Sequence, residues 1–136
     1  PNINMLGIRE PDIYGKKTYT SLVSDIEEHA RQNGIEARIC QSNHEGDLID
    51  EIQRAYGVYD GIVINPGGYT HTSVAIPDAL KAGSIPTVEV HISHVDEREE
   101  VRRINYVRCA CEHIISGHGT DGYIEAIDYL IDKHFK

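Results

Sequence analysis

The sequence lacks long apolar runs, and it contains few cysteines and little positive charge. No stretch of its 136 residues approaches the roughly 20 consecutive apolar residues that a membrane-spanning helix needs. No basic segment followed by an apolar one opens the chain, as a secretion signal would. We therefore expect no membrane partner and no secretion, and the length fits one domain.

The charge balance is acidic. Lysine and arginine number 13 against 22 aspartates and glutamates, which leaves a formal net charge of -9. The densest basic group, Arg98, Arg102 and Arg103, is interleaved with acidic residues. Because phosphate binding needs clustered lysines and arginines, this pattern argues against nucleic acid as the main partner.

The three cysteines are Cys40, Cys109 and Cys111. Their odd number and irregular spacing favour reduced thiols and a cytoplasmic location over a disulfide framework. Cys109 and Cys111 lie two apart in an apolar run, so on a strand they would share a face. We interpret them as small buried side chains rather than as a metal or redox site.

Helix-like and strand-like segments alternate along the chain, which indicates an α/β fold with a parallel sheet. Thr18 is a candidate N-cap of the first helix, and Gly34 is a candidate stop signal. The predicted helices span about 18–33, 47–56, 73–82 and 121–133, and the predicted strands about 35–41, 61–65, 87–92 and 107–116. Because such domains usually begin with a buried strand, we expect a further apolar strand upstream of Pro1.

Polar residues concentrate after two of the apolar strands, where ligands bind in open α/β sheets. Asn65 ends one predicted strand and is followed by a polar segment that includes His71 and Ser73. His91 and Ser93 end the next strand. We expect Asn65, His71 and His91 to face one crevice. The alternative is that these residues serve as turns and caps, as Ser73 does in either case.

Other chemistries fit the residues less well. The lysines lie in predicted loops, on helix surfaces or at the terminus, whereas a Schiff-base lysine needs an apolar site. His91 and His94 are close in sequence but fall on different local structure, which disfavours zinc. No Gly-x-Ser-x-Gly turn is present. Residues 117–122 (GHGTDG) match a dinucleotide-binding pattern, but we interpret them as a tight turn with close helix packing.

Seven segments together carry a specific resemblance over essentially the whole chain. They are residues 1–7 (PNINMLG), 9–11 (REP), 14–15 (YG), 41–46 (QSNHEG), 64–73 (INPGGYTHTS), 89–93 (EVHIS) and 119–123 (GTDGY). In this order and spacing the chain resembles the type II 3-dehydroquinate dehydratases. The resemblance implies a single flavodoxin-like catalytic domain over residues 1–136, a three-layer sandwich whose sheet would contain the upstream strand.

The resemblance also implies an activity. The enzyme would convert 3-dehydroquinate to 3-dehydroshikimate and water through an enolate, and would use no cofactor and no metal. The reaction is a step of aromatic amino acid biosynthesis and also of quinate breakdown, and the sequence leaves both roles open. The assembly of the enzyme would be a homododecamer built as a tetramer of trimers. Residues 8–17 would form a mobile lid that excludes water.

The resemblance assigns catalytic roles to five residues. Tyr14 would be the base, and Arg9 would favour its phenolate by charge. His91 would be the acid, with Glu89 as its orienting partner, because a histidine titrates near neutral pH. Asn2 would hold a water against the enolate oxygen.

A second group of residues would bind the substrate. Those that match hydroxyl-binding positions are Asn65, His71 and Arg102, those that match a carboxylate cradle are Ile92 and Ser93, and Asp78 matches a residue donated by a neighbouring subunit. The chain departs from the family pattern at His94, His118 and Pro77. The rival interpretations are a non-catalytic flavodoxin-like domain that binds a small molecule, or one that binds a nucleotide at the glycine turn.

Overall fold

A parallel three-stranded sheet lies at the centre of the computed structural model, which describes residues 1–8, 12, 17–94 and 99–136. The strands are β1 (Ile62–Ile64), β2 (Thr87–His91) and β3 (His113–Ser116). Their order is β1-β2-β3, so β2 is central, with Val63 opposite Val88 and Val90 opposite Ile115. All five residues of β2 are buried.

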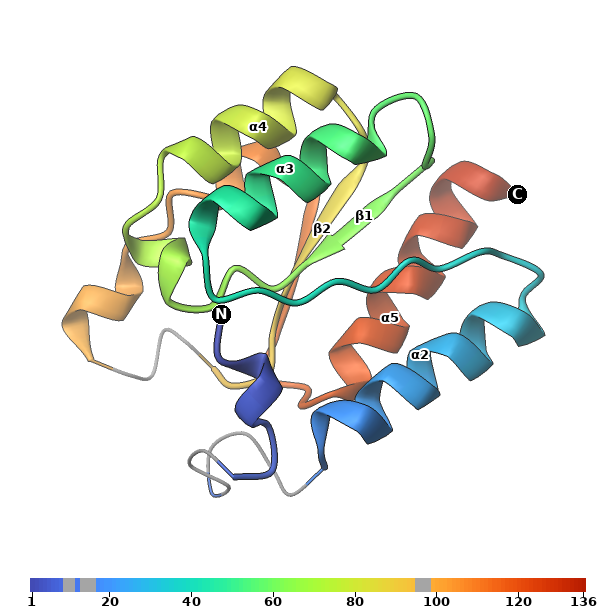
Figure 1. The fold of residues 1–136 in the computed structure, drawn as a ribbon, viewed down its shortest axis with the longest axis horizontal. Helices are drawn as coiled ribbons and strands as arrows, with labels where there is room; N and C mark the ends of the chain where they lie inside the picture. The colour runs from blue at the N-terminus through green and yellow to red at the C-terminus, as the bar shows by residue number, and fades with distance from the viewer. Residues whose placement is uncertain (9–11, 13–16, 95–98) are drawn as a thin grey trace.

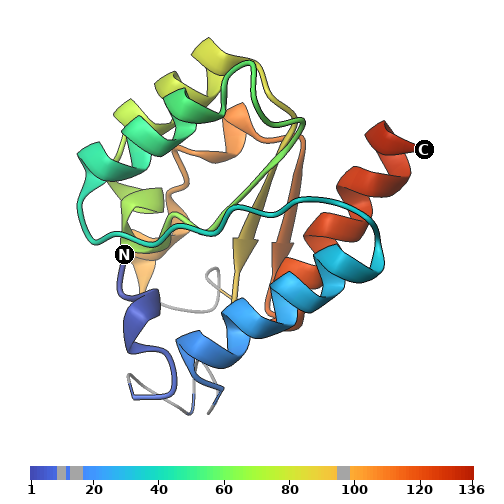
Figure 2. The same ribbon diagram turned by 45° about the vertical axis from the view of Figure 1, so that its right-hand side comes forward.

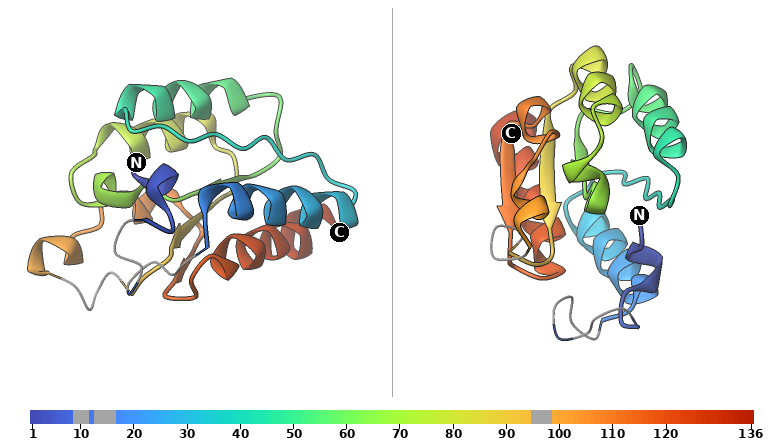
Figure 3. Two further views of the ribbon diagram at one scale, coloured as in Figure 1. Left: turned by 60° about the horizontal axis from the view of Figure 1, so that its bottom comes forward. Right: turned by 90° about the vertical axis from the view of Figure 1, so that its left-hand side faces the viewer.

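Helices cover both faces of this sheet and form a three-layer sandwich (Figure 1). On one face lie α2 (Tyr19–Gln32) and α5 (Asp121–Leu130), and on the other lie α3 (Glu45–Ala55) and α4 (Ala75–Gly83) (Figures 2 and 3). The short turns are η1 (Ile3–Met5), η2 (Gly67–His71), η4 (Glu100–Arg103), η5 (Arg108–Ala110) and the π-helical turn η6 (Ile131–Phe135). The predicted α/β sandwich is thereby confirmed.

Two hydrophobic cores separate the layers. The core under α2 and α5 contains Val88 and Val90 of β2, whereas the core under α3 and α4 contains Ile64 of β1. Side chains alternate between the faces of a strand, so Thr87, Glu89 and His91 point away from α5. A carboxylate and an imidazole thus lie side by side on the opposite face of the central strand.

Local capping explains two of the helix starts. The Thr18 hydroxyl oxygen accepts a hydrogen bond from the Ser21 amide at 3.1 Å, as predicted for the N-cap of α2. The Ser73 hydroxyl oxygen accepts one from the Ile76 amide at 3.0 Å, which confirms its predicted capping role ahead of α4. Among the described residues, no helix is long and apolar enough to cross a membrane.

The predicted strand at residues 35–41 is wrong, because the structure assigns no strand there. Ile35, Ala37 and Ile39 are half-buried and pack on the core under α2 and α5, whereas the residues between them are exposed. The alternation therefore does orient the segment. The segment is not a strand because it forms no ladder of backbone hydrogen bonds with a neighbouring strand among the described residues, and side-chain alternation alone cannot predict such a neighbour. The expected strand upstream of Pro1 stays a prediction.

The predicted strand at residues 107–116 is too long, since β3 begins only at His113. The Asn105 side-chain oxygen accepts hydrogen bonds from the amides of Val107 and Arg108, both at 2.9 Å. This side chain competes with a strand ladder and produces the η5 turn. The interpretation of the cysteines as buried neighbours on one strand is therefore wrong: Cys109 is exposed and Cys111 is half-buried.

The glycine-rich segment between β3 and α5 is a tight turn, as predicted. Gly117 and Gly119 have φ angles of 81° and 62°, a conformation that side chains disfavour. A Cβ atom on Gly122 would lie 3.1 Å from Val90 Cγ1. The close approach of α5 to the sheet therefore explains the third glycine of the pattern without a nucleotide.

Candidate active site

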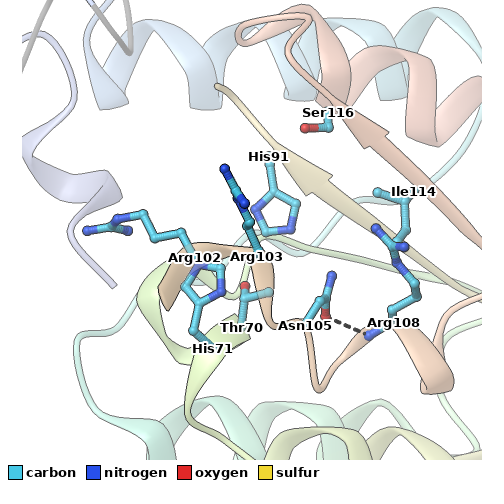
Figure 4. Close-up of a pocket in the computed structure, with 9 residues that line it drawn as sticks. All are labelled: Thr70, His71, His91, Arg102, Arg103, Asn105, Arg108, Ile114 and Ser116. Carbon is cyan, nitrogen blue, oxygen red and sulfur yellow. Dashed lines mark hydrogen bonds between the residues drawn. The ribbon is translucent and has the colours of Figure 1, made fainter. Parts of the chain in front are cut away.

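A hollow lies beside the carboxyl ends of β2 and β3, with about 290 Å³ of empty space that includes the open solvent at its mouth (Figure 4). Its lining residues are Thr70, His71, His91, Arg102, Arg103, Asn105, Arg108, Ile114 and Ser116. His71 and Arg102 lie to one side of His91, and Arg108 and Ile114 to the other. The structure thus brings together three of the predicted site residues, His71, His91 and Arg102, at the predicted edge of the sheet.

Glu89 and His91 form a buried pair on β2. The His91 Nε2 atom lies 2.5 Å from the Glu89 Oε2 atom, and the side chains are 5% and 0% exposed. Residues two apart on a strand share a face, so the strand geometry itself creates the pair. A carboxylate only accepts hydrogen bonds, so the His91 Nε2 atom bears a hydrogen and donates it to Glu89. The Nδ1 atom is then the ring nitrogen that remains for contact with a ligand.

Two further groups contact the Glu89 carboxylate. The Asn105 side-chain amide donates to Oε2 at 2.6 Å, and the Cys111 thiol lies 4.0 Å from Oε1. Burial, and then the nearby charge of Glu89, raise the pKa of the Cys111 thiol to about 12. Cys111 therefore stays protonated at neutral pH and can donate weakly to the carboxylate.

The η2 turn contributes two buried polar atoms that have no hydrogen-bond partner among the residues that the structure describes, His71 Nε2 and Thr70 Oγ1. The His71 Nδ1 atom donates to the carbonyl oxygen of Ile104 at 2.6 Å, which fixes the tautomer and leaves Nε2 as an acceptor. A buried unpaired acceptor is costly, so such atoms in a hollow suit a ligand that can donate to them. Hydroxyl groups are donors of this kind.

Arg102 brings positive charge to the same hollow. Its side chain is 23% exposed, and its Nε atom lies 3.5 Å from the Glu99 carboxylate, too far and too poorly aligned for a hydrogen bond. Arg103 and Arg108 also line the hollow. This local concentration of guanidinium groups contrasts with the net charge of -9 and favours an anionic ligand.

Asn65 follows β1 but does not line this hollow. Its amide nitrogen donates to the Tyr123 hydroxyl at 2.7 Å, and its oxygen accepts from the Gly67 amide at 3.0 Å. Burial raises the pKa of Tyr123 to about 12, against the opposing effect of the hydrogen bond from Asn65. An amide nitrogen has two hydrogens, so one stays available to a ligand.

The segment after β2 is fastened to the glycine turn. The amides of Gly117 and Gly119 donate to the carbonyl oxygens of His91 and Ile92, each at 3.1 Å. The Ser116 hydroxyl donates to the carbonyl oxygen of Ser93 at 3.1 Å. These bonds hold the carbonyl oxygens of Ile92 and Ser93 toward the glycine turn. Their backbone amides are not used in these bonds, and a carboxylate cradle would need such amides.

Two further predicted residues, Asn2 and Asp78, do not line the hollow. Asn2 is exposed with a left-handed φ of 67°, and its amide donates to the Asn43 side-chain oxygen at 2.8 Å. Asp78 is exposed in the first turn of α4. Arg9 and Tyr14 fall outside the described residues.

The departures from the family pattern have different surroundings. A Cβ atom on Gly117 would clash with the His94 ring, so the ring packs directly against that glycine. His118 pairs with Glu125 at 2.6 Å on the surface, and Pro77 is buried in α4. Only His94 therefore adjoins the segment that carries Ser93.

Comparison with known proteins assigns both the sequence and the fold of this chain to one protein family. The family described as "Dehydroquinase class II" matches residues 1–131. The chain belongs to this family. It is 49% identical over 136 residues to the 3-dehydroquinate dehydratase 1 of Corynebacterium efficiens, which covers 100% of this chain and 90% of that relative.

Two solved structures of class II dehydroquinases agree with the fold. The type II dehydroquinase from Butyrivibrio crossotus matches with a TM-score of 0.94 at 55% identity, covering 96% of this chain and 91% of that one. The type II dehydroquinase from Propionibacterium acnes matches with a TM-score of 0.93 at 35% identity, covering 98% and 92%. The family resemblance predicted from the seven segments is thus confirmed.

Three contacts of this dehydroquinase site were not predicted from the sequence: Asn105 and Cys111 beside Glu89, and Tyr123 beside Asn65. An asparagine shortly before a turn is a signal for side-chain capping, which marks Asn105 as a turn residue only. Cys111 and Tyr123 reach their partners across the fold, 22 and 58 residues away in sequence. No local pattern reveals such pairs.

Proposed function

We propose that this chain dehydrates 3-dehydroquinate to 3-dehydroshikimate, with a tyrosine base and a histidine acid. The observation that carries the proposal is the buried Glu89–His91 pair, 2.5 Å apart, beside a hollow that also contains His71 and Arg102. The membership in the class II dehydroquinase family supports the same reaction. The names of relatives such as that of Corynebacterium efficiens identify the substrate.

The substrate is a β-hydroxy ketone, so its dehydration needs one base and one acid. The base removes a proton beside the carbonyl, an enolate forms, and the hydroxyl group leaves as water after it receives a proton. In our proposal His91 supplies that second proton from Nδ1, while Glu89 holds Nε2 and stabilises the imidazolium before transfer. Side-chain acid–base chemistry of this kind contributes about 10²- to 10⁴-fold to a rate.

The base in this proposal is Tyr14, with Arg9 as the group that makes its ionisation possible. A tyrosine titrates near 10, so forming the phenolate at pH 7 costs about 4 kcal/mol. A guanidinium within a few ångströms lowers that cost by charge. Both residues belong to residues 8–17, which we propose close over the substrate as a lid and exclude water.

The substrate groups are then assigned by chemistry. His71 Nε2 accepts a hydrogen bond from a substrate hydroxyl, and Asn65 and Arg102 donate to substrate oxygens. The amides of Ile92 and Ser93, with the Ser93 hydroxyl, hold the carboxylate. Asn2 holds a water against the enolate oxygen.

The assembly completes the proposal. We propose a dodecamer of four trimers in which Asp78 enters the site of a neighbouring subunit, and a cytoplasmic location. The exposed position of Asp78 in the first turn of α4 is compatible with such a contact. Because this residue would act only across an interface, the isolated subunit would have an incomplete site.

The direct test is an absorbance assay. Purified protein mixed with 3-dehydroquinate should produce the ultraviolet absorbance of the conjugated enone in 3-dehydroshikimate. If folded oligomer binds the compound but the absorbance stays flat, the chain is a non-catalytic binding domain. Thermal stabilisation by dinucleotides, without turnover, would instead support nucleotide binding at the glycine turn.

A further inference from the structure

Asn105 connects the acid side of the site to the chain that follows it. Its amide nitrogen donates to Glu89 Oε2 at 2.6 Å, and its oxygen accepts from the amides of Val107 and Arg108, both at 2.9 Å. Two backbone N–H groups require an acceptor, so the side chain can have only one orientation. The nitrogen must face Glu89.

The oxygen that Asn105 contacts is also the oxygen that holds His91. His91 Nε2 lies 2.5 Å from Glu89 Oε2, so one carboxylate oxygen sits between an imidazole and an amide. Rotation of the carboxylate would break both contacts at once. Glu89 is fully buried, so a lost donor would leave its carboxylate with an unsatisfied acceptor, and the Asn105 amide restricts where this carboxylate can point.

The contacts of Asn105 in the turn make this restriction rigid. The donor is held by backbone amides at the start of η5 rather than by a flexible surface chain. Cys111, at the end of the same turn, reaches the other carboxylate oxygen, Oε1, at 4.0 Å. Residues at the two ends of the turn therefore contact both carboxylate oxygens of Glu89, Asn105 at Oε2 and Cys111 at Oε1. Formation of the turn itself does not require either contact.

We propose that Asn105 is a positioning residue for the acid step, which holds Glu89 in the orientation that directs His91 Nδ1 toward the substrate. The inference rests on the proposed dehydratase function. Loss of a hydrogen bond to a charged, buried acceptor should lower kcat by about 10- to 100-fold. Asn105 lines the hollow, but in this mechanism it bonds Glu89 and the turn amides rather than substrate, so KM should change by no more than about twofold.

Two variants distinguish the role of Asn105 in positioning Glu89 from its role in forming the turn. Asn105→Asp keeps an oxygen for the amides of Val107 and Arg108 but replaces the donor by a second carboxylate oxygen facing Glu89, so we expect it to lower the Tm through repulsion between the two carboxylates. Asn105→Ala removes both functions. The matched control is Asn33→Asp at the end of α2, where the side chain donates only to the His29 carbonyl oxygen. We expect this control to keep the kcat of the unaltered protein.

The readouts are kcat, KM, thermal unfolding, and the NMR signal of the His91 Nε2 proton in ¹⁵N-labelled protein without substrate. We expect both Asn105 variants to lose kcat and to shift or broaden the Nε2 signal, with Asn105→Ala, which adds no charge, as the variant that keeps the higher Tm. Unchanged kcat and an unchanged Nε2 signal in both variants, even with a lower Tm, would assign Asn105 to the turn alone and overturn the proposal. If the unaltered protein forms no enone at all, the dehydratase assignment fails, while the NMR signal still reports on Asn105.

Discussion

Replacing Glu89 by glutamine should separate activity from stability. Glu89→Gln keeps the shape of the side chain and can keep an oxygen opposite His91 Nε2 and the Asn105 amide, which lie 2.5 and 2.6 Å from Oε2 in the structure. The amide nitrogen would then face Cys111. The change removes a negative charge that is fully buried, and little else.

The magnitudes differ for folding and for catalysis. Hydrogen bonds to a charged acceptor contribute roughly 1.5–3 kcal/mol and neutral ones about 0.5–1.5 kcal/mol, so the imidazolium loses about 1–2 kcal/mol of stabilisation. We therefore expect kcat to fall about 5- to 30-fold. Folding should suffer less, because removing a buried charge also removes its desolvation cost, and buried ion pairs are often replaced at little net cost.

His91→Ala provides the contrast. It leaves the Glu89 carboxylate buried without its strongest partner, which should cost about 3–5 kcal/mol of unfolding free energy. The matched control for the first change is Glu112→Gln, where the carboxylate accepts from Lys133, His134 and Tyr129 on the surface. This control should leave kcat unaltered.

The assay is the initial rate of enone formation across substrate concentrations, paired with urea unfolding at the same pH. A Glu89→Gln protein with full kcat would refute the orienting role of Glu89. A Glu89→Gln protein that unfolds as readily as His91→Ala would show that the charge of this pair stabilises the fold, contrary to the reasoning above.

Three further predictions concern other parts of the chain. His71→Ala should raise KM about tenfold with a smaller change in kcat, since Nε2 is a buried acceptor beside the hollow with no partner in the described part of the chain, and an unchanged KM would remove His71 from substrate binding. Gly122→Ala should lower the free energy of unfolding by about 1–3 kcal/mol, measured in urea, because its Cβ would lie 3.1 Å from Val90 and 3.4 Å from Ile115. Arg38 lowers the pKa of the Glu51 carboxyl to about 2 from its usual value near 4.5, so this ion pair stabilises the fold above pH 4.5 and its contribution is lost as the pH falls toward 2. Glu51→Gln should therefore cost about 0.5–1 kcal/mol at pH 6 and nothing at pH 2, and an equal cost at both pH values would exclude the ion pair as its cause.

The sequence predicted those parts of the fold that depend on local chemistry. The hydroxyl of Thr18, the Gly117 and Gly119 turn, and the strand at about residues 87–92 each depend on a few neighbouring residues, and each was found as predicted. The strand at residues 35–41 failed for the opposite reason. Its side-chain alternation is local, whereas its hydrogen-bond partners are not.

The candidate site shows the same division. His91 and Glu89 could be paired from sequence, because a spacing of two places residues on one face of a strand. Asn105 could be recognised as a turn residue, but its contact with Glu89 joins residues 16 apart and depends on how η5 folds over β2. Likewise, the contact between Asn65 and Tyr123 depends on the close approach of α5, which Gly122 permits.

The alternation of β2 links stability and catalysis within five residues. Val88 and Val90 are fully buried in the core under α2 and α5, whereas Glu89 and His91 face the hollow side. A shift of one residue in the pairing of β2 would exchange these faces, and would place a carboxylate and an imidazole in the hydrophobic core. The valines therefore do more than stabilise the fold: by fixing the register of the central strand, they hold the proposed acid and its partner at the edge where a substrate can bind.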